Sequence, residues 1–423
     1  MLYLLLTQWV IESEYYKLFL IYVNILDNKK KCFYLCIKIY CYAIMKFTIS
    51  KDLIQKTMQH VGSAIDPRGT VPILSYIKVT AADNKLFLVA TNLDTEASDS
   101  VECVVAENGS LAIPTSTINE IIKKLPNNAQ ISFDASEKSG DDKAHRLVVS
   151  AGRSKFEVNS LSDSDFPSVF GSDFDSEISI KAKDLLAMIK VTMFAMSNKP
   201  ERYNLNGLLF HTANEEGVNN LCAIATDGHR LSFAKSVIES AVVIPNRIIP
   251  RKSITELSRI LPDYDQNSDV VIKFGANKAI FAIGTLKYIT KLLDADFPDY
   301  NRVIPKGNNK ILEINRDNLM SALERVSVVY KMGGARGVKF LIENDKVNLT
   351  SSSGFGDIAD EDVESVFSEK EKFETSYNPD FIIDALNVSA GEKMRFSFSD
   401  TTAPMLIHSD NANFYHVVMP MRF

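Results

Sequence analysis

The residues with the clearest capacity for chemistry are a carboxylate and an imidazole, Asp227 and His229, in the segment Ala225-Thr226-Asp227-Gly228-His229-Arg230-Leu231. Such a pair could transfer protons in general acid–base catalysis. No nucleophile lies near this pair in the sequence to complete a catalytic set. The sequence also contains no nucleophile-elbow motif and no Cys/His set with the spacing of a zinc site. We therefore expect a protein that is not an enzyme and carries no cofactor or metal. A hydrolase that uses Asp227 and His229 is the alternative, and a turnover that disappears in His229→Ala would support it.

A glycine-rich segment, Gly333-Gly334-Ala335-Arg336-Gly337, comes nearest to a phosphate-binding loop. It has neither the lysine nor the strand–turn–helix context of a P-loop. We interpret it as a connection between a helix and a strand.

The elements that must position these residues occur three times along the chain. Residues 113–126 are matched by residues 249–262 and, less closely, by residues 377–386. In the first copy, Ile118 and Ile122 belong to an apolar series with helical spacing, so we predict a short amphipathic helix in each copy.

Start signals precede or open these helices. Thr117 with Glu120 has the form of a capping box, and Ser253 repeats the signal in the second copy. Pro379 suits the first position of the third helix.

A second helix in each copy is predicted from similar openings: Lys51-Asp52-Leu53, Lys183-Asp184-Leu185 and Asp317-Asn318-Leu319. Between the helices, alternating apolar runs predict strands at residues 86–90, 221–225 and 347–350. The expected fold class is α+β, with three repeated domains at residues 45–172, 173–308 and 309–423.

Residues 1–44 match none of the three copies and contain the only tryptophan of the 423 residues, Trp9. Their apolar runs are interrupted by charged residues such as Glu12 and Lys17, which makes a membrane span unconvincing. A signal anchor is the alternative interpretation. We expect Met45 to be the true start, because Met45-Lys46-Phe47-Thr48-Ile49 opens the first copy, and residues 1–44 to be a misassigned or disordered extension.

The chain is acidic, with a formal net charge of −6 that becomes −8 without the extension, which holds five lysines against three carboxylates. An acidic protein usually avoids nucleic acid, but the distribution of charge matters more than the total. Cations gather on or beside the predicted helices, at Lys51, Lys56, Lys123, Lys124, Lys183, Lys190, Arg251, Lys252, Arg259, Arg316 and Arg325. Solvated helix faces would explain any one of them, whereas their recurrence on equivalent helices favours a shared partner.

Several motifs together resemble the bacterial sliding clamp family, the beta subunit of DNA polymerase III, over residues 45–423. They are Thr70-Val71-Pro72-Ile73-Leu74, Tyr203-Asn204-Leu205-Asn206-Gly207, the segment around Asp227 quoted above, Ile249-Pro250-Arg251-Lys252, Asp296-Phe297-Pro298-Asp299-Tyr300, Arg336-Gly337-Val338 and Tyr415-His416-Val417-Val418-Met419-Pro420-Met421-Arg422. Each motif is weak alone, and their order and domain-scale spacing make the set specific.

The resemblance implies three domains of DNA-clamp fold, each with two helices packed on antiparallel sheets. Two chains would form a homodimer, head to tail, that closes a six-domain ring around double-stranded DNA. The helices would line the hole, so that their cations face phosphate in weak, sequence-independent contacts that permit sliding. The implied partners are the replicative polymerase subunit, a clamp loader with its own ATPase, other polymerases and repair proteins; a cytoplasmic location and no membrane association follow.

The resemblance carries over a few DNA contacts. Lys199 and Arg202 could bind phosphate, and Tyr203 could stack on an exposed base. Arg68 matches another such position, whereas Ser116 stands where some family members have a basic residue, so we expect that contact to be missing. An ordinary charged loop is the alternative for the segment that contains Lys199.

The resemblance also implies a pocket for short peptides of partner proteins. Its residues would be Leu205, Thr226, Gly228, His229, Arg230, Leu231, Pro298, Arg302, Val303, Thr402, Pro404, Val418, Met419, Pro420, Met421 and Arg422. Leu, Val, Pro and Met side chains make an adaptable apolar hole for leucine or phenylalanine anchors. Without the resemblance, His229 would be interpreted as a turn residue and Met421 as core.

The dimer contact implied by the resemblance pairs an edge strand of the first domain with the third domain. Its residues would be Arg153, Lys155, Phe156, Val158, Val328 and Val329, with the two cations facing Asp360-Glu361-Asp362. Core packing within each domain is the alternative. A monomeric peptide-binding scaffold that never encircles DNA would keep the pocket and show no dimer.

Overall fold

The computed structural model describes residues 45–65, 71–135, 144–167, 171, 173–331, 337–408 and 411–421. The predictions for residues 1–44, Arg68, the segment 332–336 and Arg422 lie outside these ranges. The described residues form two compact units. Unit 1 falls within Met1–Gln55, Tyr76–Phe87 and Val101–Phe166, and unit 2 within Lys56–Ser75, Leu88–Ser100 and Pro167–Phe423.

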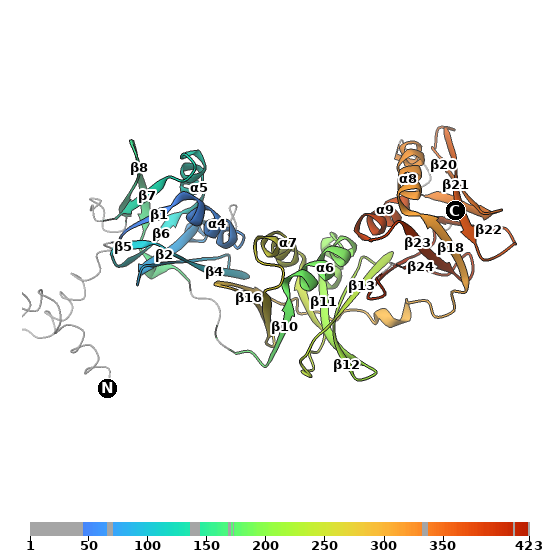
Figure 1. The fold of residues 1–423 in the computed structure, drawn as a ribbon, viewed down its shortest axis with the longest axis horizontal. Coiled ribbons are helices and arrows are strands. Elements are labelled where there is room, and N and C mark those ends of the chain that lie inside the picture. Colours follow the sequence, from blue (N-terminus) through green and yellow to red (C-terminus); the bar gives the residue numbers. More distant parts are fainter. Residues whose placement is uncertain are drawn as a thin grey trace, which may run out of the picture. The chain divides into compact units, whose positions relative to one another are not determined.

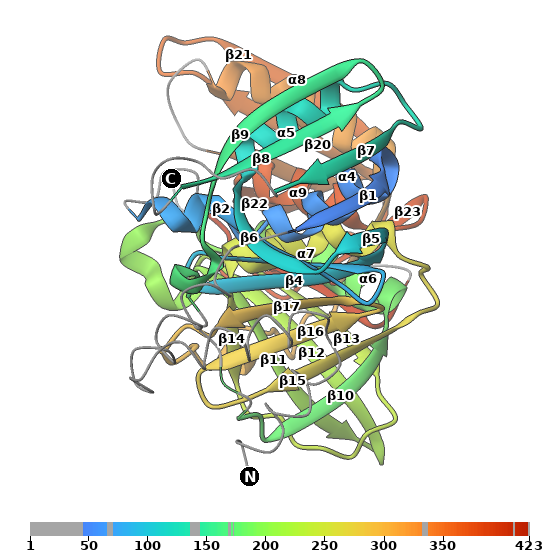
Figure 2. The same cartoon turned by 90° about the vertical axis from the view of Figure 1, so that its left-hand side faces the viewer.

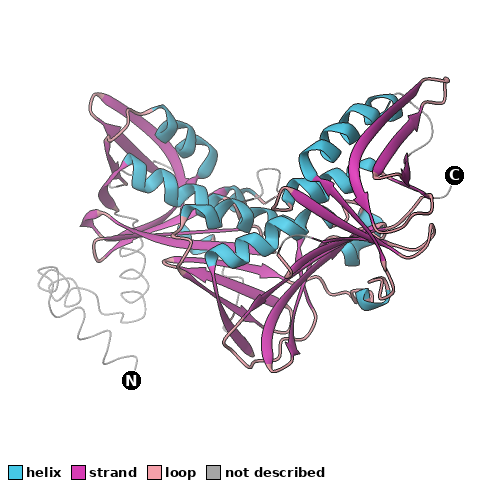
Figure 3. Cartoon of the chain, turned by 45° about the vertical axis from the view of Figure 1, so that its right-hand side comes forward, coloured by secondary structure: helices cyan, strands magenta, loops and turns pink. Residues whose placement is uncertain are grey.

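One order of elements occurs three times along the chain (Figure 1). A strand leads directly into a helix at β1 (Lys46–Ser50) and α4 (Lys51–Gly62), β10 (Ser176–Lys181) and α6 (Ala182–Thr192), and β18 (Lys310–Asn315) and α8 (Arg316–Lys331). A second strand–helix pair follows at β6 (Gly109–Pro114) and α5 (Thr115–Lys124), β14 (Arg247–Pro250) and α7 (Arg251–Ile260), and β22 (Phe373–Tyr377) and α9 (Pro379–Val388). The predicted two helices per repeat are confirmed, and Figure 3 shows helices lying beside strands.

The predicted start signals are right for only one of these helices. Helix α5 begins at Thr115 after Pro114, so Thr117 lies inside the first turn and caps nothing. Ser253 is likewise inside α7, where its buried hydroxyl bonds to a neighbouring strand. Both helices follow directly on a proline that ends a strand, Pro114 or Pro250. The pairing of that strand in its sheet fixes where the helix begins, and no side chain caps it. Pro379 does occupy the first turn of α9, after an Asn378 cap.

Unit 1 contains an antiparallel sheet in the order β2-β6-β9-β8-β7-β1-β5. The additional strands are β2 (Tyr76–Ala82), β5 (Val104–Glu107), β7 (Gln130–Asp134), β8 (Ala144–Ala151) and β9 (Ser154–Leu161). Figure 2 shows β9, β8, β7 and β1 as neighbouring strands. Phe47 of β1 stacks on Phe133 of β7 with ring centroids 4.7 Å apart, and α5 buries Ile118 and Ile122. Strands β3 (Lys85–Thr91) and β4 (Thr95–Glu102) contribute residues to both units.

Unit 2 contains one antiparallel run in the order β10-β15-β16-β17-β4, in which Thr95–Ser98 of β4 pair with β17. Its strands are β15 (Asp269–Phe274), β16 (Lys278–Ile283) and β17 (Leu286–Lys291), visible as a row in Figure 2. Helices α6 and α7 contact each other, as do α8 and α9.

A second sheet of unit 2 joins the last two repeats. Among the described residues its order is β14-β11-β12-β13-β25-β24-β23-β18-β21-β20-β19-β22. The further strands are β11 (Gly207–Glu215), β12 (Val218–Thr226), β13 (Arg230–Val237), β19 (Val338–Glu343), β20 (Lys346–Ser352), β21 (Ile358–Phe367), β23 (Lys393–Phe398), β24 (Met405–His408) and β25 (Phe414–Val418). The joint is the antiparallel pair β13 and β25, from Arg230 opposite Val418 to Ala234 opposite Phe414. A side chain at the end of this pair is therefore shared by two repeats.

Candidate functional site

A cavity of about 220 Å³ lies at the end of the β13 and β25 pair. It is lined by Leu205, Thr226, Gly228, His229, Arg230, Leu231, Pro298, Asp299, Tyr300, Val303, Val417 and Met419. Its floor is apolar, because Leu205, Leu231 and Val417 belong to one buried hydrophobic cluster. Its rim comes from the turn between β12 and β13, from the segment around the 3₁₀ helix η6 (Tyr300–Arg302), and from Met419.

The turn between β12 and β13 is held by its own side chains. The Asp227 carboxylate accepts the backbone N–H groups of His229 at 2.9 Å and of Arg230 at 3.1 Å. Thr226 Oγ1 donates to the Arg230 carbonyl at 2.6 Å and accepts the Gly228 N–H at 3.1 Å. Gly228 has φ of +89°, a conformation that only glycine adopts readily. This sequence therefore fixes the rim of the cavity before any guest arrives.

Arg230 ties the rim to the third repeat. Its guanidinium lies over the rings of Phe194 and Phe381, at 5.1 and 4.6 Å from their centroids. It donates to Asp227 at 3.0 Å, to Asp384 of α9 at 2.6 Å and to the Phe194 carbonyl at 3.0 Å. Because these partners already accept hydrogen bonds from the guanidinium, Arg230 mainly holds the wall of the cavity in place. It has few N–H groups left to donate to a guest.

Strand β25 supplies the opposite wall, because its successive side chains point alternately toward the cavity and away from it. Val417 faces the cavity cluster, whereas Val418 points to the other side and is buried in the core of the third repeat. Met419 donates its N–H to the His229 carbonyl at 2.9 Å, and the residue is 39% exposed. Neighbouring residues of one strand point to opposite faces, so Val417 lines the cavity and the predicted Val418 does not.

Nine predicted pocket residues line the cavity: Leu205, Thr226, Gly228, His229, Arg230, Leu231, Pro298, Val303 and Met419. Five other predicted and described residues, besides Val418, do not: Arg302, Thr402, Pro404, Pro420 and Met421. Arg302 extends into solvent and pairs with Asp299 at 3.0 Å. Thr402 bonds to Asp400 in its own turn at 2.7 Å.

The residues missed by sequence reasoning are Asp299, Tyr300 and Val417. Tyr300 donates its hydroxyl to His211 Nε2 at 2.8 Å, since His211 Nδ1 faces the Thr212 carbonyl at 3.2 Å. Burial raises the pKa of Tyr300 to about 12, so it remains a neutral phenol. The signal for Asp299 and Tyr300 was available, because both lie in the quoted motif with Pro298.

Behind the cavity, a buried histidine joins β25 to β13 and α6. His416 Nδ1 donates to Ser232 Oγ at 2.7 Å, and that hydroxyl donates to the Val191 carbonyl at 2.5 Å. The other ring nitrogen, Nε2, is buried without a partner. Burial and, second, the charge of Arg230 lower the pKa of His416 to about 3, so the ring is neutral.

The geometry gives no support to a hydrolase at Asp227 and His229. The carboxylate is occupied by two backbone N–H groups and by Arg230, and the ring of His229 stacks near Phe381 at 6.4 Å. A catalytic pair needs a hydrogen bond that orients the base, and the described residues form none between this carboxylate and this imidazole.

The predicted DNA-contact loop forms the 3₁₀ helix η4 (Pro200–Leu205), next to the cavity. Lys199 is exposed and Tyr203 is 53% exposed. The Arg202 side chain instead donates to the Asp227 carbonyl, so it braces the rim. Arg68 lies outside the described residues, and Ser116 is exposed at the start of α5.

The helix cations do not form one set, which corrects the expectation that they all face a partner. Lys51 is buried and donates to the Leu125 carbonyl at 2.6 Å, where it neutralises the C-terminal end of α5. Arg316 does the same for α9 through the Ser389 carbonyl at 2.9 Å. The exposed cations that form no ion pair with described residues are Lys56, Lys124, Lys183, Lys190 and Lys252.

The predicted dimer residues lie on strand edges and a helix face. In the described sheet, β9 pairs with β8 over its length and with β6 only at Leu161, and β21 meets β18 only from Ser365 to Phe367. Arg153 and Lys155 are exposed, Phe156 and Val329 are half-buried, Val158 is buried in its own unit, and Val328 is 60% exposed. The acidic segment is already engaged, because Arg325 pairs with Glu361 and Lys346 pairs with Asp362 at 2.7 Å.

In the described part of the chain, no helix combines the length and apolar character needed to cross a membrane.

Comparison with known proteins gives consistent matches along the chain. The family models for the N-terminal, central and C-terminal domains of the DNA polymerase III beta subunit match residues 45–170, 179–299 and 301–422. The domain limits 45–172, 173–308 and 309–423 remain predictions in their detail. The Beta sliding clamp of Caulobacter vibrioides is 37% identical over 380 residues, which are 89% of this chain and 100% of the relative. The Beta sliding clamp of Escherichia coli (strain K12) is 30% identical over the same share of both chains.

Two solved structures have similar folds. The Caulobacter crescentus beta sliding clamp, with PEG bound to a putative beta-motif tethering region, has a TM-score of 0.84 at 36% identity and covers 90% of this chain and 100% of its own. A sliding clamp from Bartonella birtlesii bound to griselimycin has a TM-score of 0.83 at 31% identity with the same coverage.

Proposed function

Because the chain belongs to the DNA polymerase III beta subunit family, the bacterial sliding clamps, and is a processivity factor of DNA replication, we propose that it acts without catalytic residues, as a ring that holds other proteins on DNA. Processivity would then come from the ring that encloses the DNA and from the partner proteins tethered to it. The partners would carry out the catalytic steps. We place the protein in the cytoplasm, where the DNA and the polymerase of a bacterium lie.

The observation that carries the tethering role is the cavity at the end of β13 and β25. Its floor of Leu205, Leu231 and Val417 would bury a leucine or phenylalanine anchor, and the flexible Met419 at its edge can adapt to different guests. Asp227 already holds the rim turn in one conformation, so the turn loses little conformational entropy when a peptide binds. The ligand-bound Caulobacter and Bartonella clamps support a tethering site in such proteins. We assign it here to peptides of the replicative polymerase, the clamp loader, other polymerases and repair proteins.

We assign the DNA contact to the exposed helix cations and to the η4 loop. Lys124 ends α5, Lys183 and Lys190 lie on α6, and Lys252 lies on α7. Lysines without a carboxylate partner remain available for phosphate, and weak contacts of this kind do not fix one register on the duplex. Tyr203 adds an exposed ring on which a base could stack.

A homodimer would close the ring. The free edge of β9 in one chain would pair with the free edge of β21 in the partner, and the exposed Val328 would pack against the Phe156 side. Arg153 and Lys155 would meet the acidic strand at the rim. Because Glu361 and Asp362 already have cationic partners in their own chain, the apolar contact should contribute more than these rim charges.

Solution mass by light scattering over a dilution series tests the dimer. The wild-type chain should have twice the chain mass, and Val328→Asp should weaken the dimer about tenfold or more, because a carboxylate would be buried without a partner. Val237→Asp is the matched control, since Val237 is 63% exposed and lies away from both edges. Retention on circular DNA, and its loss after linearisation, tests encirclement.

A wild-type chain that stays monomeric at micromolar concentration would overturn the ring and leave a monomeric peptide-binding scaffold. Retention that is equal on linear and circular DNA would instead contradict topological binding.

A further inference from the structure

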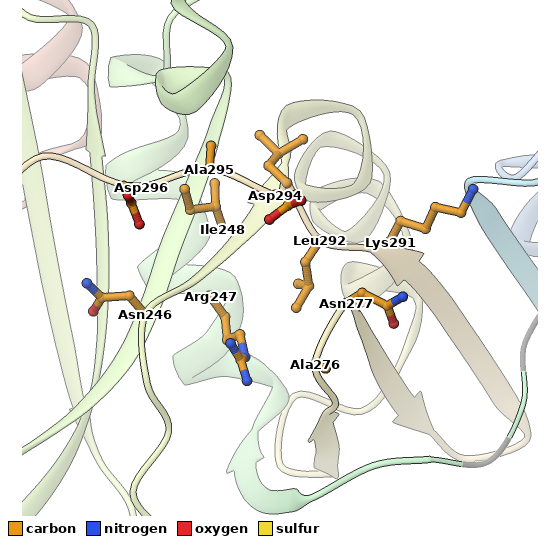
Figure 4. A pocket seen from close by; sticks show the side chains of 11 residues that line it. Asn246, Arg247, Ile248, Ala276, Asn277, Lys291, Leu292, Asp294, Ala295 and Asp296 are labelled. Atoms are coloured by element: carbon orange, nitrogen blue, oxygen red, sulfur yellow. The ribbon is translucent and has the colours of Figure 1, made fainter.

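A second and larger cavity, of about 670 Å³, lies in unit 2 between the two sheets (Figure 4). One wall is β14, the last strand of its sheet, and the other is the segment that follows β17. None of the residues assigned to the peptide pocket lines it. We call it the Arg247 cleft, after the residue of β14 that points into it.

The cleft lies beside β14, which is an edge strand of its sheet. Strand β14 pairs with β11 on one side, and on the other side Leu293 donates its N–H to the Ile248 carbonyl at 3.0 Å. This is the single backbone bond between β14 and residues 291–296 within the described chain. Such an unpaired edge can accept an extended segment.

Arg247 has an unusual environment for an arginine. It is half-buried, its Nε is buried without a hydrogen-bond partner, and its side chain forms no ion pair with any described residue. A guanidinium carries five donors, and removing donors from water without acceptors is costly. An acceptor that enters the cleft could satisfy donors of this guanidinium.

The carboxylates of the cleft are placed apart from this guanidinium. Figure 4 shows Asp294 and Asp296 along the segment that crosses the upper part of the cleft, with Arg247 below them and Asn277 on the facing wall. Neither carboxylate forms an ion pair with described residues, and Lys291 is turned to Asp94 at 2.9 Å. The cleft thus has one cationic end and one anionic end.

The separation of Arg247 from Asp294 and Asp296 favours some anions over others. A phosphate dianion on Arg247 would be repelled by Asp294 and Asp296, whereas a single carboxylate is repelled less. A ligand that also carries a cation toward the two carboxylates would gain at both ends. A bidentate pair with a guanidinium is the usual way to hold a carboxylate.

We propose that the Arg247 cleft is a second peptide site, which binds an extended segment of a partner protein through an acidic side chain on Arg247 and a basic side chain near Asp294 and Asp296. The acidic side chain accepts from the guanidinium, and the peptide backbone uses the free edge of β14. The site goes beyond the proposed tethering pocket and does not depend on it.

The test is a titration of the full-length protein, observed at the Arg247 Nε–H resonance by NMR. The probes are N-acetyl-aspartate amide, the peptide acetyl-Asp-Ala-Lys-amide and inorganic phosphate. Both carboxylate probes should shift the resonance, the peptide should bind more tightly, and phosphate should bind less tightly than either. Calorimetry of Arg247→Gln should show peptide affinity reduced about tenfold, the loss expected for a charge-assisted hydrogen bond. Lys287→Gln is the matched control, because it removes the same charge from an exposed position of β17 outside the cleft.

The double variant Asp294→Asn, Asp296→Asn separates the two ends. It should remove the advantage of the lysine-containing peptide and leave N-acetyl-aspartate amide binding unchanged or tighter. An Arg247 resonance that no carboxylate probe shifts, or equal affinities of wild type and Arg247→Gln, would overturn the site. Phosphate that binds more tightly than the peptide would overturn the assignment to an acidic peptide.

Discussion

Replacing Met419 and Pro298 together by alanine should weaken the binding of a peptide with leucine and phenylalanine anchors, whereas Met421→Ala should not. Met419 and Pro298 line the cavity, and Met421 does not. The backbone bond of Met421 to the Ser376 carbonyl, at 2.8 Å, does not depend on its side chain. Met421→Ala is therefore a matched control in the same terminal segment.

The size of the effect follows from the contact that is lost. Met→Ala removes three methylene-sized groups, worth about 0.8 kcal/mol each when fully buried. Because Met419 is 39% exposed in the free chain, a guest can bury only that part, and the loss is about 1 kcal/mol. The exposed Pro298 should add about 1 kcal/mol by the same argument, so the double variant should bind about thirtyfold more weakly.

Fluorescence polarisation with a labelled peptide measures the change, and the light-scattering mass shows that the variants keep the assembly state of the wild type. An unchanged affinity in the double variant would refute the pocket assignment. An equal loss in Met421→Ala would show that the terminal segment rearranges on binding, so that the cavity geometry of the free chain is not the one that recognises peptides.

Two further predictions concern the frame of the same pocket. Gly228→Ala should lower the free energy of unfolding by about 1–3 kcal/mol, because φ is +89° and the new Cβ would lie 2.6 Å from Arg202 Nη1; an unchanged denaturant midpoint would contradict this. His416 has a folded-state pKa of about 3, below its ordinary value of 6.5, so the unfolded chain takes up a proton that the folded chain refuses and stability falls as the pH drops below 6.5. Between pH 7 and pH 5 the wild type should lose about 2 kcal/mol more than His416→Gln in urea denaturation, and equal losses in both proteins would refute a neutral buried ring.

The repeat architecture could be predicted from the sequence because apolar spacing is local. The helices at residues 115–124, 251–260 and 379–388 follow from such patterns. The starting residues of the first two did not follow, since Pro114 and Pro250 end strands whose pairing is decided by distant residues. The capping box would start the first helix at Thr117, but the pairing of the preceding strand starts it at Thr115.

Part of the site could be predicted in the same way. The turn Thr226 to Arg230 contains its own hydrogen-bond partners, so its sequence fixes its shape. The choice of Val417 over Val418 required the register of β25 against β13, which is not visible in either segment alone. Lys51 and Lys183 open their helices with the same Lys-Asp-Leu pattern, yet only packing shows that the first is buried against α5 and the second is exposed.

The pairing of β13 with β25 also sets the earliest point in synthesis at which the cavity can be complete. Arg230 is opposite Val418, so one wall of the pocket is translated long before the other. A nascent chain that has not yet released residues 414–419 lacks the Val417 and Met419 wall and cannot offer partners a complete cavity. Under the proposed tethering role, a chain could recruit partners only after its third repeat has been made and has joined the sheet, and unfinished chains on the ribosome would not compete for polymerases.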